Sequence, residues 1–392
     1  MSETGKDRPD TCPPSEPPES KVDEKFPTVV LGLMCDPGLP TETARWLVDD
    51  LERDLSERVS DQVRWEVRLE TGPLRLDDDG RVPLVLLARE LRPRLGWDLI
   101  VCVTDLPRQL SSTPVVADIS VCHGIALASL PALGVVGLRR RFRDTLLYLA
   151  GELGHGLVGG KAGRERHRAG GKWAPVTWVD NPDAEIEESL ALVGWRGRLR
   201  LLAGMIRDNK PWRLVPELST ALAAGFAAAA FGIFYSSIWT LADALSNRRL
   251  LLISMLAVGA MVAWLIVYNR LWERSPTSKT KARLYNTASV LSLTFGVTSA
   301  YLVLFAVTFA GAFTVIESGY LASSLGHPVG IGDYLTLSWL AASMGTFAGA
   351  LGSSLESEEA VYRAAYSRRE RARRQRSREL REAEEARESD GE

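Results

Sequence analysis

Residues 141–157 of the chain have the sequence RFRDTLLYLAGELGHGL. Apolar side chains recur in this stretch at helical spacing, and this pattern predicts a helix from Gly137 to His155. The helix ends in the pentapeptide GELGH, which would place Glu152 and His155 one turn apart on one face. These two side chains are the candidate chemical groups of the surrounding domain.

The pentapeptide differs at one position from the motif H-E-x-x-H, in which two histidines bind zinc and the glutamate activates a metal-bound water. Gly151 replaces the first histidine, and positions 156–161 (GLVGGK) supply no further ligand. Catalytic zinc takes at least three protein ligands. We therefore expect no enzymatic activity and no cofactor. Only an active site would use Glu152 as catalytic base and His155 as metal ligand, with zinc as the one candidate cofactor.

Runs of apolar and alternating residues before this helix predict a folded α/β domain over residues 27–158. The order is strand, helix, strand, helix, three strands, helix, which indicates one mixed sheet in a layered architecture. The expected strands are 27–35, 62–69, 97–103, 115–120 and 124–129, and the first two helices are 41–59 and 82–95.

Three stretches of this domain resemble the zincin metalloproteases, most of all the archaemetzincin-like branch. They are WDLIVCVTDLP (97–107), GIALASLPALG (124–134) and the helix ending GELGHGL. The resemblance covers about residues 28–157 and implies a zincin-like fold in which the second stretch is the edge strand. It also implies family roles for Glu152 as general base and His155 as zinc ligand. Because Gly151 departs from the family pattern, the implied site is degenerate, with a cleft beside the edge strand that would accept an extended peptide.

The segments flanking the domain are polar. Residues 1–26 are rich in Pro, Ser, Glu and Asp, which predicts a disordered tail. Residues 159–213 begin as a Gly-rich basic loop, and a helix is expected from Asp183, where acidic residues suit a helix N-terminus. Residues 195–212 mix arginines with leucines, as in an amphipathic helix at a membrane surface. Cys35 and the other three cysteines show no CxxC spacing, so we expect all four to be reduced.

Residues 214–355 form a membrane region. Charge-free runs each exceed the roughly 18 apolar residues that predict a spanning helix; they are Leu218–Ala242, Leu250–Tyr268, Thr287–Ile316 and Tyr334–Leu355. No run contains an internal charged residue or histidine, which disfavours an ion or proton pathway. Gly345 and Gly349 form a GxxxG pattern, for which packing within the four-helix unit is favoured over a dimer interface.

The distribution of basic residues predicts the orientation. Segment 196–213 and the loop after the second span are basic, whereas Glu317–Asp333 has two acids and no Lys or Arg. The pair Arg248-Arg249 between the first two spans is the one exception to this distribution. By the positive-inside rule, both termini and the α/β domain are expected in the bacterial cytoplasm, with the spans in the inner membrane. Residues 356–392 predict a charged helical tail whose arginine cluster at 368–378 suits anionic lipid head groups.

These features predict a multi-pass membrane protein. Its degenerate zincin-like domain would be a binding or regulatory module for a protein or peptide partner. The whole chain resembles a class of actinobacterial integral membrane proteins, which implies a membrane location but no particular activity. Two alternatives stay open: a membrane-bound zinc peptidase with unusual ligands, and a small transport or channel unit. With 47 Lys+Arg against 49 Asp+Glu, the net charge of -2 predicts no nucleic-acid partner. A homo-oligomer is possible through the small-residue surfaces.

Overall fold

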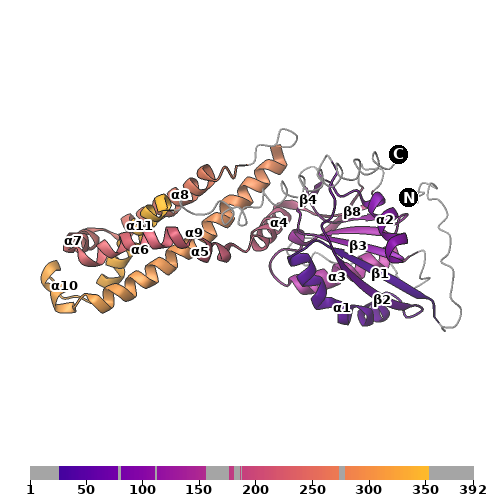
Figure 1. Ribbon diagram of the computed structural model, residues 1–392, viewed down its shortest axis with the longest axis horizontal. Coiled ribbons are helices and arrows are strands. Elements are labelled where there is room, and N and C mark those ends of the chain that lie inside the picture. Colours follow the sequence, from indigo (N-terminus) through magenta and orange to yellow (C-terminus); the bar gives the residue numbers. More distant parts are fainter. Residues whose placement is uncertain are drawn as a thin grey trace, which may run out of the picture. The chain divides into compact units, whose positions relative to one another are not determined.

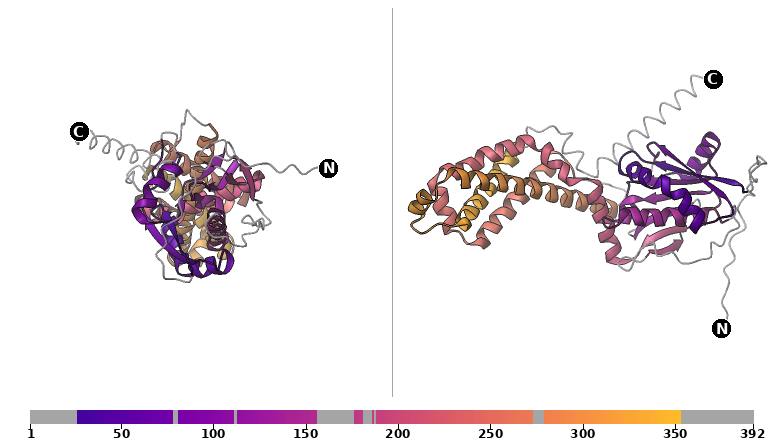
Figure 2. Two further views of the ribbon diagram at one scale, coloured as in Figure 1. Left: turned by 90° about the vertical axis from the view of Figure 1, so that its right-hand side faces the viewer. Right: turned by 90° about the horizontal axis from the view of Figure 1, so that it is seen from below.

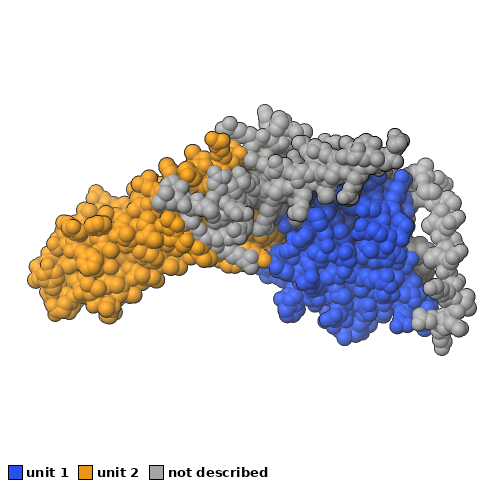
Figure 3. All heavy atoms as spheres, viewed as in Figure 1, with its two compact units in different colours: residues 1–204 blue, residues 205–392 orange. Residues whose placement is uncertain are grey.

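The computed structural model describes residues 26–77, 81–110, 113–155, 176–180, 186, 188–272 and 279–352. The predictions for the N-terminal tail, for the basic loop with His167 and for the charged C-terminal tail fall on residues outside these ranges. The chain divides into two compact units, Met1–Gly204 and Met205–Glu392, which Figure 3 colours separately. Each unit is described by itself.

The first unit is an α/β domain, as predicted. Its elements in chain order are β1 (Thr28–Cys35), α1 (Leu39–Arg58), β2 (Arg64–Thr71), α2 (Leu84–Leu95), β3 (Leu99–Thr104), β4 (Arg108–Leu110), β5 (Thr113–Ser120), β6 (Ile125–Ser129), the 3-10 helix η1 (Leu130–Leu133), α3 (Leu138–Leu153), β7 (Val176–Asp180), β8 (Glu188–Leu192) and α4 (Gly194–Asp208). The predicted order through α3 is confirmed, with β4 as an additional short strand.

One mixed sheet organises this unit, with strand order β2-β1-β3-β6-β5-β8-β7 and β4 pairing with β5. Strands β2, β1, β3 and β6 are parallel, and β5, β8 and β7 are added antiparallel. The connection from β1 through α1 leads to β2 on one side, and the connection from β2 through α2 leads back past β1 to β3 on the other side. Because these two connections run in opposite directions, right-handed crossovers put α1 and α2 on opposite faces of the sheet. Figure 1 shows α1 and α3 together on one face and α2 on the other.

Two predictions about the sheet are wrong. The stretch GIALASLPALG does not form an edge strand, because β6 lies between β3 and β5 inside the sheet. The helix predicted to start at Asp183 is not continued at Glu188–Leu192, because these residues form β8, which pairs with β5 on one side and β7 on the other. Four of the five β8 residues are buried, and the burial available between two strands outweighs the helix-start signal of the preceding acids.

The core on the α2 face packs the apolar side of that helix against Ile100, Cys102, Ile125 and Leu127. Cys35 and Cys102 are free and buried, as expected, and burial, assisted by the charge of Asp36, raises the pKa of the Cys35 thiol to about 12. A thiol with that pKa stays protonated and behaves as a small apolar group. The expectation of four reduced cysteines is wrong for Cys122, which is disulfide-bonded.

The second unit is helical. After α4 its elements are the 3-10 helix η2 (Pro211–Arg213), α5 (Leu214–Glu217), α6 (Ser219–Phe234), α7 (Ser236–Ala244), α8 (Asn247–Tyr268), α9 (Lys279–Val315), α10 (Ser318–Leu325) and α11 (Ile331–Gly352). Three stretches are long and apolar enough to cross a membrane: Asn247–Tyr268, Ala282–Val315 and Ile331–Gly352. These three agree with predicted spans. Figures 1 and 2 both show α6, α8, α9 and α11 running alongside one another, and α11 contacts the other three.

The first predicted span is broken. Helices α6 and α7 meet at an angle of 87°, with Tyr235 in an extended conformation between them. The indole Nε1 of Trp239 donates a 2.9 Å hydrogen bond to the carbonyl of Gly232, near the end of α6. Trp239 also packs edge-to-face on Tyr320 of α10, with ring centroids 5.5 Å apart. The bend is therefore held by a contact between segments about eighty residues apart, which a hydropathy window does not detect.

The small residues of α6 and α11 lie against each other. A Cβ atom on Gly345 would be 2.5 Å from the carbonyl oxygen of Gly225, and one on Gly349 would be 2.8 Å from that of Ala221. Only glycine permits backbones to come this close. The predicted role of the GxxxG pattern, tight packing within the helical unit, is confirmed.

Candidate functional site

The carboxyl ends of the parallel strands are the usual ligand site of an open α/β sheet. Here Asp36 follows β1 at this edge and is fully buried. Its carboxylate accepts hydrogen bonds from Thr104 Oγ1 at 2.6 Å and from the Leu74 amide at 3.0 Å. Both oxygens of Asp36 thus tie β1 to the end of β3 and to the chain after β2, which gives this carboxylate a structural role.

The predicted catalytic residues lie at the end of α3. That helix ends at Leu153, and the amide of His155 donates a long 3.4 Å bond to the carbonyl of Glu152. His155 therefore lies beyond the helix, on an exposed turn, and does not share a helical face with Glu152. Glu152 interacts with Tyr148, whose pKa is raised first by burial and then by the charge of this carboxylate and a hydrogen bond to it.

The other histidine of the described α/β domain is His123, at the β5–β6 turn. Its Nδ1 lies 3.0 Å from Ser120 Oγ, and its carbonyl accepts a bond from Arg92. Within the described ranges, Glu152 and His155 are not joined by a third His, Cys, Asp or Glu at metal-ligand spacing. His167, in the predicted basic loop, lies outside those ranges.

A cavity of about 470 Å³ opens between α1 and α3. Its wall is formed by Leu47, Arg58, Arg139, Arg140, Arg143 and Asp144. Four arginines thus face one aspartate, and Asp144 shares its charge between Arg58 and Arg140 at 3.9 Å from each. The cavity carries an excess of positive charge that its own carboxylate does not neutralise.

Two further contacts fix the arginines of this wall. Arg143 donates a hydrogen bond to the carboxylate of Asp54 in α1, which is 3% exposed. The guanidinium of Arg139 lies 3.6 Å from the ring centroid of Trp46, a cation–π contact with an exposed indole. These contacts hold two arginines in place while Arg58 and Arg140 remain half-exposed or exposed. We call the cavity with the six residues of its wall the arginine pocket.

The arginine pocket adjoins the start of α3, and the helix adds to its potential. The first turn of α3 contains no acidic residue, and its N-cap, Gly137, makes no side-chain capping bond. Arg139, Arg140 and Arg141 occupy this turn, where cations are disfavoured by the positive end of the helix dipole. The placement costs stability and attracts anions, since helix N-termini bind anions even without basic side chains.

The sequence contains a signal for this pocket, which is separate from the zinc motif at the end of α3. Three consecutive arginines open a helix at the end where acids are favoured, an arrangement that local helix stability does not explain. The partners from α1, Arg58 and Trp46, come from residues more than eighty positions earlier. Only the folded chain brings them to α3.

No family model matches the chain, and no curated protein or solved structure shows significant similarity to it.

Proposed function

We propose that this membrane protein uses its α/β domain to bind a small phosphate-bearing ligand in the arginine pocket, as a binding or regulatory module and not as a zinc hydrolase. The observation that carries this proposal is the gathering of four arginines in the wall of a single cavity, against Asp144 in the same wall and Asp54 behind Arg143. The relation to zincins stays a prediction. A peptide cannot add to β6 as a further strand, because β6 is paired on both sides.

The chemistry of the pocket favours phosphate over other anions. Guanidinium groups offer paired donors that match phosphate oxygens, and a phosphate dianion can accept from several arginines at once. A volume of about 470 Å³ fits a small molecule or head group and excludes a folded partner. The shared chemistry is a phosphate ester or anhydride, whether soluble or carried on a lipid.

Removing two pocket arginines should weaken phosphate binding. In the full-length protein purified in detergent, the double variant Arg58→Gln/Arg140→Gln should bind pyrophosphate at least about tenfold more weakly, since each change removes a charge-assisted donor. Isothermal titration measures this. A second titration, with dihexanoyl phosphatidylglycerol, distinguishes a lipid head group from a soluble phosphate as the source.

The matched control is Arg68→Gln/Arg94→Gln. These arginines are about as exposed as Arg58, each pairs with a neighbouring carboxylate, and neither lines the pocket. The control removes the same net charge, so it corrects for long-range attraction. Equal weakening in both double variants, or no binding of either probe to the wild-type protein, would contradict the proposal.

We further propose four membrane crossings, with α6 and α7 together forming one, and both termini in the cytoplasm. The basic segments before the first and after the second crossing support this orientation. The disulfide of Cys122 supports the opposite one, because disulfides persist in oxidising compartments. Reporter fusions after Arg249 and Leu325 should both give a non-cytoplasmic signal. A cytoplasmic signal at either position would reverse or break the proposed topology.

A further inference from the structure

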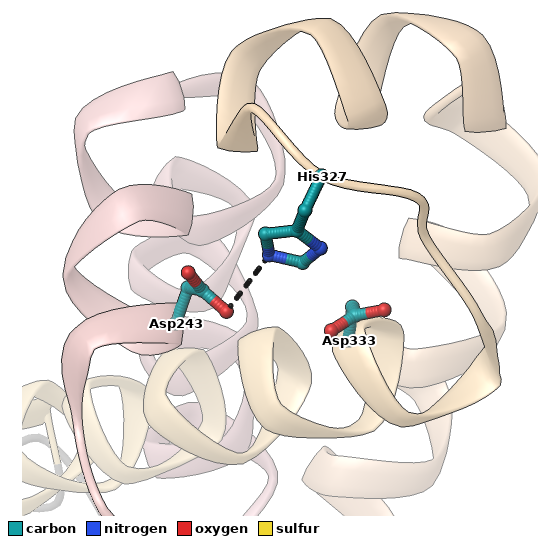
Figure 4. A group of neighbouring side chains, drawn as sticks. All are labelled: Asp243, His327 and Asp333. Carbon is teal, nitrogen blue, oxygen red and sulfur yellow. Dashed lines mark hydrogen bonds and ion pairs between the residues drawn. The ribbon is translucent and has the colours of Figure 1, made fainter.

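Three potential metal ligands meet at one end of the helical unit, far from the α3 motif in sequence. They are Asp243 near the end of α7, His327 in the α10–α11 loop and Asp333 in the first turn of α11. One ligand atom from each lies within 4.8 Å of the others. Figure 4 shows the imidazole of His327 between the two carboxylates. The spacing and the mixture of nitrogen and oxygen donors distinguish this group from a patch of surface acids.

The hydrogen bonds of His327 determine which nitrogen is available. Nδ1 lies 3.0 Å from the carbonyl oxygen of Pro328, and a carbonyl can only accept, so Nδ1 carries the hydrogen. In neutral imidazole the lone pair is then on Nε2, which lies 3.2 Å from Asp243 Oδ1. Two acceptor atoms at that distance need a positive centre shared between them, either a proton or a cation.

The geometry suits a shared metal ion. Bonds of about 2.0–2.2 Å to a tetrahedral zinc place its ligand atoms roughly 3.3 Å apart, close to the 3.2 Å between His327 Nε2 and Asp243 Oδ1. The bond from Nδ1 to a backbone carbonyl is the usual outer contact of a metal-bound histidine. Asp333 is likewise held, because one of its oxygens accepts a 2.7 Å bond from the Gly330 amide.

Among the described residues, His327 is the basic side chain that pairs with these carboxylates. Residues 317–333 contain no Lys or Arg. Arg248 and Arg249 open α8 a few residues after Asp243, yet in the described part of the chain the ion pair of Asp243 is with His327. Two aspartates therefore lie beside one imidazole, and a divalent cation between them would neutralise their charge.

We propose that Asp243, His327 and Asp333 bind a divalent transition-metal ion, for which zinc is the best fit. The imidazole nitrogen selects zinc over magnesium and calcium, which take oxygen ligands. Three protein ligands leave a position for water. The ion would join the end of α7 to the start of α11 and so fix the bent α6–α7 pair against the loop that follows α10.

The test is zinc binding by the full-length protein in detergent after removal of metals. Wild-type protein should take up one zinc per chain by elemental analysis after gel filtration, in the presence of excess Mg²⁺ and Ca²⁺. His327→Ala and Asp243→Asn should each lose that zinc. Zinc should raise the melting temperature of the wild-type protein and leave that of both variants unchanged. Asp243→Asn keeps the side-chain shape, so it remains informative if His327→Ala folds poorly.

Two control variants separate this site from the rest of the chain. Glu317→Gln removes another acid of the same region, and His155→Ala removes the histidine of the α3 motif; both should retain the zinc. Loss of zinc in His155→Ala would assign the metal to the α/β domain. That result, or zinc retained by His327→Ala, or no stoichiometric zinc on the wild-type protein, would overturn the proposal.

Discussion

Replacing Gly345 with leucine is expected to separate α6 from α11 and to unfold the helical unit at a much lower temperature. Even a Cβ atom at this position would lie 2.5 Å from the backbone oxygen of Gly225 and 3.2 Å from the Ala229 Cβ. Backbone atoms cannot move aside as a flexible side chain can, so the helices themselves must shift. We expect a loss of at least about 3 kcal/mol, at the upper end of overpacking costs.

The matched control for this change is Gly259→Leu. Gly259 lies within α8, and a Cβ atom there would meet nothing within 4 Å. The same substitution should therefore be neutral or slightly stabilising, because leucine is the better helix former. Thermal unfolding of both variants in detergent, followed by gel filtration, gives the comparison. Equal melting temperatures for the two variants would show that the α6–α11 contact is not tight.

The second large effect is expected for Gly32→Ala in the centre of the sheet. The ring of Trp97 covers Gly32 so closely that a Cβ atom would lie 2.0 Å from ring atoms Cδ2 and Cε3. Trp97 is 3% exposed and packs among the core residues under α2, so its ring has little room to move. A single added methyl group should cost about 2–4 kcal/mol, which is large for a glycine-to-alanine change.

Gly151→Ala provides the opposite result from the same chemical change. Its Cβ atom would lie 3.8 Å from Val59 Cγ1, an ordinary contact, inside helix α3. Alanine there should stabilise the helix by up to about 1 kcal/mol. Hydrogen exchange in the full-length protein measures each effect locally, at the β1 and β3 amides for Gly32→Ala and at the α3 amides for Gly151→Ala. Unchanged protection in Gly32→Ala would mean that the Trp97 ring is displaced at little cost.

The parts of the fold that could be predicted are those set by local patterns. Buried apolar runs gave β1, β3 and β6, and helical spacing gave α1, α2 and α3. The positions of strands in the sheet could not be predicted, because β8 completes the sheet from seventy residues beyond β5. The strand pattern before α3 ends with β5 and β6, and nothing in it indicates that a later strand pairs with β5. The acids before Glu188 therefore indicate the start of a helix.

The candidate sites were less predictable than the fold. The α3 motif was visible because its residues are consecutive, yet its His155 falls after the end of the helix. The arginine pocket and the Asp243–His327–Asp333 group combine residues more than eighty positions apart. Asp243 and Asp333 did carry a weak signal, since each stands immediately outside a charge-free run. The bend between α6 and α7, which the sequence does not predict, places Asp243 beside His327 and Asp333.

Helix α9 has a mechanical consequence of its own. It is continuous over 37 residues, which corresponds to a rod of roughly 56 Å, nearly twice the roughly 30 Å hydrocarbon layer of a bilayer. A stiff rod of that length is a lever: a tilt of about 5° at one end moves the other by roughly 5 Å. A tilt of that size about the Val315 end, where α10 follows, would therefore move the basic end near Lys279 by several ångströms.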